Sequence, residues 1–134
     1  TEIRATLASL REGFPTDRLI VVFQPHQYSR TRFLLKDFAA SFTLADKVVV
    51  PDIYFVRDSV MEMKHVNAAI LADRIRRNGR EALYLPTFDE IVAYLREIVR
   101  PGDVVLTLGA GPVYRVGDRL LREIRRHGPS PDAR

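Results

Sequence analysis

Short apolar runs without polar alternation place the strongest constraint on what this sequence can fold into. Residues 19–23 read LIVVF and residues 48–50 read VVV, so neither run offers a polar face to solvent. Such β-branched runs are typical of strands buried on both faces, as in parallel sheets covered by helices. Residues 82–85 and 104–108 form two further runs, which predict a third and a fourth strand.

Apolar residues at helical spacing fill the segments between these runs. The segments with this spacing are 2–12, 34–46, 68–75, 88–99 and 113–124. Thr87 and Glu90 match a capping box that begins one helix, and Gly13 and Asn78-Gly79 are stop signals after two others. The alternation predicts an α/β protein with a three-layer Rossmann-like fold, in which a mostly parallel sheet has helices on both faces.

The length of 134 residues predicts one domain, and no internal boundary interrupts residues 1–128. Residues 129–134 contain two prolines and are expected to form a flexible tail. Hydrophobic residues make up 46% and charged residues 28%, which excludes a disordered chain. The absence of cysteine excludes disulfides, thiolate metal sites and a cysteine nucleophile.

Charge and hydropathy bear on the partners. No apolar run approaches the roughly 20 residues that span a bilayer, so we expect a cytoplasmic protein without a membrane partner. The net charge of +4 owes much to arginines after residue 114, where a solvated Arg/Glu helix face is the favoured interpretation. Aromatic residues that could stack on bases are not interleaved there, so no nucleic-acid partner is expected. His65 and His127 lie on polar helix stretches, and no metal site is predicted there.

The loop after the first strand carries the densest group of chemical side chains. Parallel sheets bind ligands at the carboxyl ends of their strands, and residues 24–32 follow such an end. His26, Tyr28 and Arg30 lie in this turn, just before a predicted helix. A helix N-terminus and an arginine together suit a carboxylate or a phosphate. The alternative is a capped turn in which these side chains only pack.

Two other loops share that edge of the predicted sheet. Gly109, Ala110 and Gly111 form half of a phosphate-binding turn, where missing Cβ atoms let a ligand or a neighbouring backbone come close. The third glycine of a dinucleotide fingerprint is absent, so a tight turn without a ligand is an equal alternative. The secondary candidates Asp52, Tyr54 and Arg57 follow the second strand, and a surface pair of Arg57 with Asp58 is the plainer interpretation there.

The motifs of several enzyme classes are missing. The chain has no P-loop, no G-x-S-x-G elbow and no pair of catalytic carboxylates. We therefore predict no catalytic residue in this chain. If ATP or a metal ion is used, another part of the protein must supply that machinery.

Residues 23–31, FQPHQYSRT, resemble the F-Q-P-H-R-Y-S/T-R-T pattern of the C-terminal domain of Mur ligases that add L-alanine. The D-I-Y segment at 52–54 with Arg57 resembles the family's D-I-Y-x-x-R-E loop. Residues 102–111 resemble its G-D-V-V-L-T-x-G-A-G segment. The resemblance covers residues 1–127, with Gln27 in place of the family's usual arginine.

The resemblance implies a bacterial enzyme of peptidoglycan synthesis that ligates L-alanine to UDP-N-acetylmuramate through an acyl phosphate. It also implies that ATP and Mg²⁺ are bound mainly by upstream domains of the same polypeptide. Arg30 would anchor the alanine carboxylate, His26, Gln27 and Tyr28 would complete the pocket, and the turn at 109–111 would allow close approach.

The same resemblance implies that this chain is a fragment. The family's D-D-Y-G-H-H-P segment would precede Thr1, so the first strand of the sheet is expected to lie upstream. The isolated chain is expected to be inactive. Two other hypotheses remain open: a stand-alone nucleotide- or phosphate-binding module of Rossmann-like fold, and an arginine-rich nucleic-acid binder with steeply salt-dependent affinity.

Overall fold

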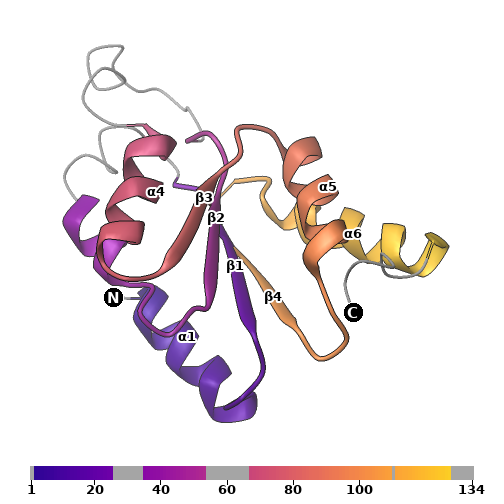
Figure 1. Cartoon of the computed structure of the whole chain (residues 1–134), viewed down its shortest axis with the longest axis horizontal. Coiled ribbons are helices and arrows are strands. Elements are labelled where there is room, and N and C mark those ends of the chain that lie inside the picture. The colour runs from indigo at the N-terminus through magenta and orange to yellow at the C-terminus, as the bar shows by residue number, and fades with distance from the viewer. Residues whose placement is uncertain (1, 26–34, 54–66, 110, 128–134) are drawn as a thin grey trace.

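The predicted strands pair as one parallel sheet in the computed structural model (Figure 1). The structure describes residues 2–25, 35–53, 67–109 and 111–127. Along the sheet, the order is β3-β2-β1-β4. The strand bounds are β1 (Leu19–Phe23), β2 (Lys47–Val50), β3 (Glu81–Tyr84) and β4 (Val104–Leu108). Val21 of β1 is in register with Val48 and Leu106, which places β1 between β2 and β4.

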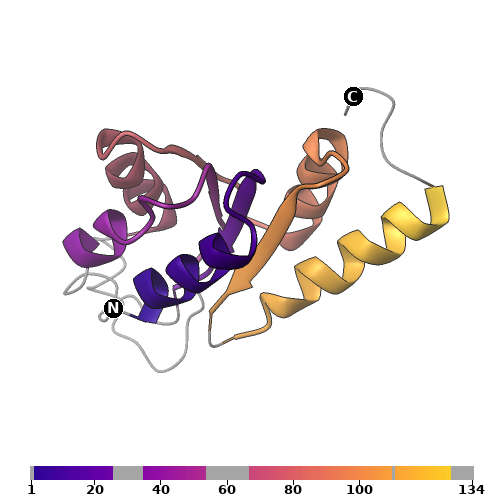
Figure 2. The same ribbon diagram turned by 90° about the horizontal axis from the view of Figure 1, so that it is seen from below.

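Helices cover both faces of this sheet, which confirms the predicted three-layer α/β fold (Figure 2). On one face, α1 (Glu2–Gly13), α4 (Ala68–Arg77) and a helical segment at 35–40 pack together. On the other face lie α5 (Phe88–Ile98) and α6 (Tyr114–His127). Thr87 and Glu90 form the predicted capping box at the start of α5. No helix in the described ranges has both the length and the apolar character to span a bilayer.

Side chains of β1 divide between two hydrophobic clusters. Leu19, Val21 and Phe23 belong to the cluster under α1 and α4, and Phe23 packs against the ring of Phe42 at 5.2 Å between centroids. Ile20 and Val22 belong to the cluster under α5 and α6. All five side chains of β1 are buried, as the unbroken apolar run predicts.

Some details differ from the sequence predictions. The helix expected to end near residue 46 ends at residue 40, because the Ser41 and Ala45 N–H groups bond three residues back and tighten the chain into turns. Strand β3 begins and ends one residue earlier than predicted. Leu121 is 48% exposed, because it lies about 100° around α6 from the buried Leu120.

Candidate functional site

Gln24 joins three strand ends at the carboxyl edge of the sheet. It follows β1 directly, and its backbone N–H donates to the Leu108 carbonyl at 3.0 Å. Its side-chain Nε2 donates to the backbone carbonyl of Asp52 at 2.9 Å, just beyond β2. Only 7% of Gln24 is exposed. One buried polar residue therefore holds the ends of β1, β2 and β4 together.

Asp52 presents an exposed carboxylate at the same edge. The Tyr84 hydroxyl, at the end of β3, donates a hydrogen bond to Asp52 Oδ1. The Asp52 backbone N–H donates to the Pro86 carbonyl at 3.2 Å. These contacts fix the carboxylate at the ends of β2 and β3, where it can accept hydrogen bonds from a cationic or amine-bearing ligand.

Gly109 directly follows β4 and lies against the backbone of Gln24, which follows β1. A Cβ atom built on Gly109 would lie 2.7 Å from the Gln24 carbonyl oxygen and 3.0 Å from Val113 Cγ1. Its φ is +154°, a backbone conformation that residues other than glycine rarely adopt. The missing Cβ at Gly109 thus makes room for the neighbouring backbone of Gln24. The sequence had left open whether a ligand or a neighbouring backbone would come close here.

Most of the predicted site residues lie outside the described residues. They are His26, Gln27, Tyr28, Arg30, Tyr54, Arg57 and Ala110. Of the others, Asp52 and Gly109 come together at the carboxyl edge, as the parallel sheet predicts, and Gly111 is half-buried. The sequence analysis did not single out Gln24 or Tyr84. The available signal was a polar residue that follows an entirely apolar strand without a break.

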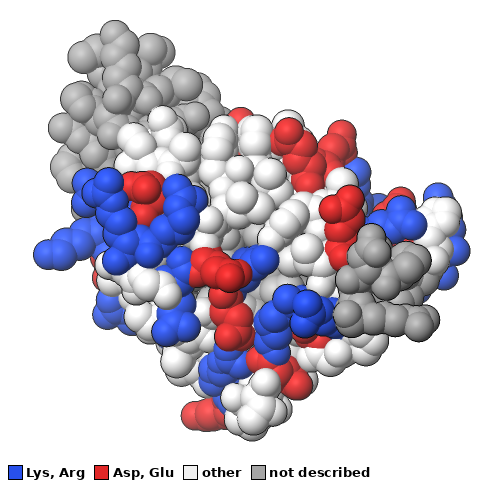
Figure 3. Space-filling view, viewed as in Figure 1, with Lys and Arg blue, Asp and Glu red and all other residues white. Residues whose placement is uncertain are grey.

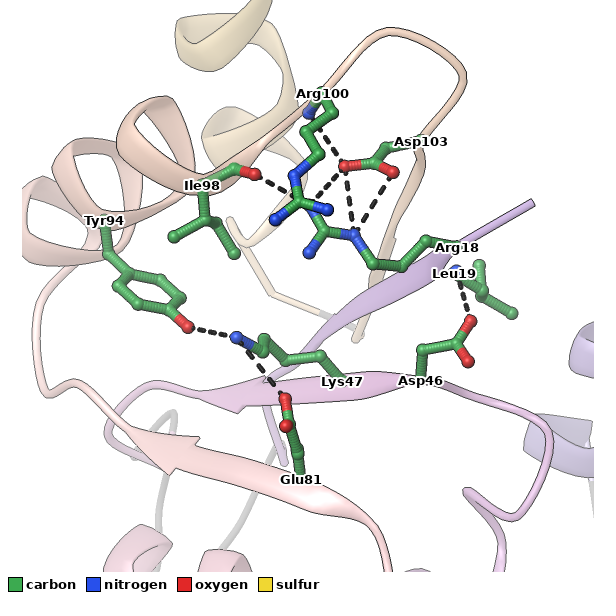
Figure 4. Close-up of polar contacts among 9 residues, drawn as sticks. All are labelled: Arg18, Leu19, Asp46, Lys47, Glu81, Tyr94, Ile98, Arg100 and Asp103. Atoms are coloured by element: carbon green, nitrogen blue, oxygen red, sulfur yellow. Dashed lines mark hydrogen bonds and ion pairs between the residues drawn. The ribbon is translucent and has the colours of Figure 1, made fainter. Parts of the chain in front are cut away.

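A polar network ties the strands together at their opposite, amino ends (Figure 4). Asp103 accepts hydrogen bonds from Arg18 Nη2 at 2.5 Å and from the Arg100 N–H at 2.8 Å. Lys47 Nζ donates to the Tyr94 hydroxyl at 2.6 Å and lies 3.5 Å from Glu81. The hydrogen bond from Arg18 to Asp103 raises the pKa of the Arg18 guanidinium. Asp46 Oδ2 accepts a hydrogen bond from the Leu19 N–H at 2.7 Å, which joins the starts of β1 and β2. The network thus links the starts of all four strands.

A hollow of about 400 Å³ lies beside this network, lined in part by Arg18, Lys47 and Arg80. It sits at the end of the sheet away from the candidate loops. Of the three cations that line it, Arg18 and Lys47 are each paired with a carboxylate. We therefore assign a structural role to the amino edge.

Asp46 gives this network a pH dependence. Burial alone would raise the pKa of Asp46, but hydrogen bonds from the Leu19 N–H and from Arg11, helped by the arginine charges, outweigh it and lower the pKa. Since the folded-state pKa lies below the unfolded value of about 3.9, this stabilisation is complete above that value and is lost as the pH falls through the folded-state pKa. Asp46→Asn should therefore be less stable than the wild type at pH 7 and differ less from it at pH 3.

Urea denaturation at several pH values tests this expectation. A difference between the two proteins that stays constant from pH 7 to pH 3 would show that the charge of Asp46 is not responsible.

Charges of both signs are interspersed over the molecular face drawn in Figure 3. On α6, Arg119 lies 2.7 Å from Asp89, and Glu123 lies 3.4 Å from Arg96. These pairs agree with a solvated Arg/Glu helix face. Among the described residues, no group of three His, Asp or Glu side chains is placed to hold a metal ion.

Comparison with known proteins decides the family. Residues 1–111 match the family model described as Mur ligase, glutamate ligase domain. The chain belongs to the Mur ligase family. The resemblance carried by the FQPH turn, the D-I-Y loop and the GAG segment is thereby confirmed.

Relatives of this Mur ligase domain include two proteins named UDP-N-acetylmuramate–L-alanine ligase. The one from Acetivibrio thermocellus is 46% identical over 124 residues, which are 92% of this chain and 26% of the relative. The one from Caldanaerobacter subterraneus is 47% identical over 122 residues, which are 91% of this chain and 26% of the relative. This chain thus spans about a quarter of the length of these relatives.

A solved structure shares the fold of this Mur ligase domain. The UDP-N-acetylmuramate–alanine ligase of Thermotoga maritima superposes with a TM-score of 0.71 and 25% identity. The match covers 93% of this chain and 24% of that protein.

Proposed function

We propose that this chain is the C-terminal domain of an ATP-dependent ligase that joins L-alanine to UDP-N-acetylmuramate in peptidoglycan synthesis. The observation that carries the proposal is the 46% identity, over 92% of the chain, to a relative named for that reaction. The enzyme would act in the bacterial cytoplasm, and its upstream domains would be the domain's partners. Residues 1–128 form the domain in this proposal, with 129–134 as its tail.

The chemistry divides between domains in this proposal. ATP transfers its γ-phosphoryl group to the muramate carboxylate, and ADP leaves. The alanine amine then attacks the acyl phosphate, inorganic phosphate leaves and the amide bond forms. The described residues do not fit a magnesium site, since they hold no cluster of metal ligands. ATP and Mg²⁺ would therefore be bound mainly by the upstream domains.

The carboxyl edge supplies the amino-acid side of the site. The turn that carries Arg30 begins two residues after Gln24, at the sheet edge where ligands of parallel folds bind. Arg30 would hold the alanine carboxylate through two parallel hydrogen bonds, with His26, Gln27 and Tyr28 completing the pocket. Asp52 and Gly109 bring the neighbouring strand ends to the same place.

Arg30→Lys in the full-length enzyme tests this assignment. The substitution keeps the charge but removes the planar fork, so kcat/KM for alanine should fall roughly 10- to 100-fold, as expected for a lost charge-assisted hydrogen bond. The KM for UDP-N-acetylmuramate should not change. Alanine-dependent release of phosphate measures both quantities.

Arg77→Lys is a matched control, because Arg77 is 71% exposed at the end of α4 and should tolerate lysine. Unchanged alanine kinetics in Arg30→Lys would remove Arg30 from the site. If the wild-type full-length protein released no phosphate in the presence of alanine, ATP and UDP-N-acetylmuramate, the proposed function itself would be wrong.

A further inference from the structure

The side-chain amide of Gln24 has a fixed orientation. Its Nε2 donates to the Asp52 carbonyl at 2.9 Å. Rotating the amide by half a turn would set two acceptor oxygens, Gln24 Oε1 and the Asp52 carbonyl, against each other. The contact therefore determines which amide atom is nitrogen, and Oε1 remains as a pure acceptor.

This acceptor has no donor. Gln24 Oε1 is buried, and no donor among the described residues forms a hydrogen bond with it. Ser41, the second buried polar residue among those that the structure describes, does find a partner, since its hydroxyl donates to the Asp37 carbonyl at 2.6 Å. Leaving a buried acceptor unpaired is unfavourable, so an unpaired one at a ligand-binding edge points to a partner that arrives with the ligand.

The surroundings of Gln24 favour a ligand that brings donors. A proline follows each of the four strands within four residues, and proline has no N–H group: these are Pro25, Pro51, Pro86 and Pro112. The backbone N–H groups of Gln24, Asp52 and Leu85 are already bonded to carbonyls. The exposed Asp52 carboxylate adds a negative charge. Among the described residues, acceptors thus gather around Gln24, which suits an amine or ammonium group at this point of the edge.

We propose that Gln24 Oε1 accepts a hydrogen bond from the amino group of the amino-acid substrate, with the Asp52 carboxylate as a second acceptor nearby. The inference rests on the proposed function and extends it to the nucleophile. The Arg30 turn would hold the carboxylate of the amino acid, while Gln24 holds its nitrogen. Gln24 takes no proton; it fixes one N–H so that the nitrogen lone pair is left to face the acyl carbon.

The test uses the full-length enzyme with Gln24→Met, which keeps the approximate size of the side chain and removes the acceptor together with the Nε2 donor to the Asp52 carbonyl. The KM for alanine should rise roughly tenfold, whereas the KM values for ATP and UDP-N-acetylmuramate stay within about twofold. Gln24→Glu keeps an acceptor oxygen, and in its protonated form the second oxygen can still donate to the Asp52 carbonyl, so it should raise the alanine KM less than Gln24→Met does. Ser41→Ala is the control, because it removes a buried polar group remote from the carboxyl edge and should lower the melting temperature without changing any KM.

Unchanged alanine KM in a folded Gln24→Met enzyme would overturn the proposal, and so would equal increases for all three substrates. A crystal structure of the wild-type enzyme with L-alanine covers the case in which the variants do not fold. The amino nitrogen within about 3.2 Å of Gln24 Oε1 would support the proposal, and a water bound there instead would refute it. Failure of the proposed function is distinguishable, because the wild-type enzyme would then show no alanine-dependent turnover.

Discussion

Gly109→Ala should lower the free energy of unfolding of the 134-residue chain by about 3 to 5 kcal/mol, the largest loss that we expect from any single methyl group here. The new Cβ would lie 2.7 Å from the Gln24 carbonyl oxygen, which belongs to the backbone and cannot rotate away. The positive φ of +154° adds strain for any side chain. Urea denaturation measures the loss.

Gly79→Ala separates the two causes. Gly79 also has a positive φ, +89°, but a Cβ there would meet no atom within 4 Å. This control carries the conformational strain without the collision, so it should cost only about 1 kcal/mol. Equal losses in the two variants would mean that the close contact between Gly109 and the Gln24 backbone adds nothing to the cost of the substitution.

Asp103→Ala should cost about 3 kcal/mol, because it breaks the most enclosed ion pair of the described chain. The Asp103 side chain is 7% exposed. It accepts hydrogen bonds from three donors, which are Arg18 Nε, Arg18 Nη2 and the Arg100 N–H. Among the described residues, alanine would leave the guanidinium with the Ile98 carbonyl as its one hydrogen-bond partner. Thermal and urea unfolding should report the same loss.

Asp89→Ala is the matched comparison for this pair. Asp89 lies 2.7 Å from Arg119 but is 84% exposed, so solvent screens the attraction and its loss should cost about 0.5 kcal/mol or less. If Asp103→Ala lowered the free energy of unfolding no more than Asp89→Ala does, the Arg18–Asp103 pair would contribute little to stability.

The fold was predictable because its strongest signals are local. The unbroken apolar run at residues 19–23 requires that both faces of the strand be covered by apolar side chains. Thr87 with Glu90 defines a helix start within four residues. The end of the helix at residue 40 was harder, because apolar spacing continues through Phe42 into the turn and does not distinguish a helix from 3₁₀-type turns.

The site was predictable only as a location. Parallel topology brings Asp52 and Gly109 to one edge, and sequence reasoning placed them there. The role of Gln24 depends on a carbonyl 28 residues away along the chain, and the Arg18–Asp103 pair joins residues 85 apart. No periodicity or motif in the sequence predicts these long-range contacts, since they follow from strand order and register.

The division of β1 side chains between two clusters bears on how such a domain can change over evolutionary time. Residues on opposite faces of the sheet, such as Ala39 and Leu95, pack in separate clusters, so the effects of substituting them should add. A lineage can therefore repack one half of the interior while the other stays as it was. An insertion or deletion of one residue within β1 would exchange the two faces, and it is the kind of change that both halves would resist together.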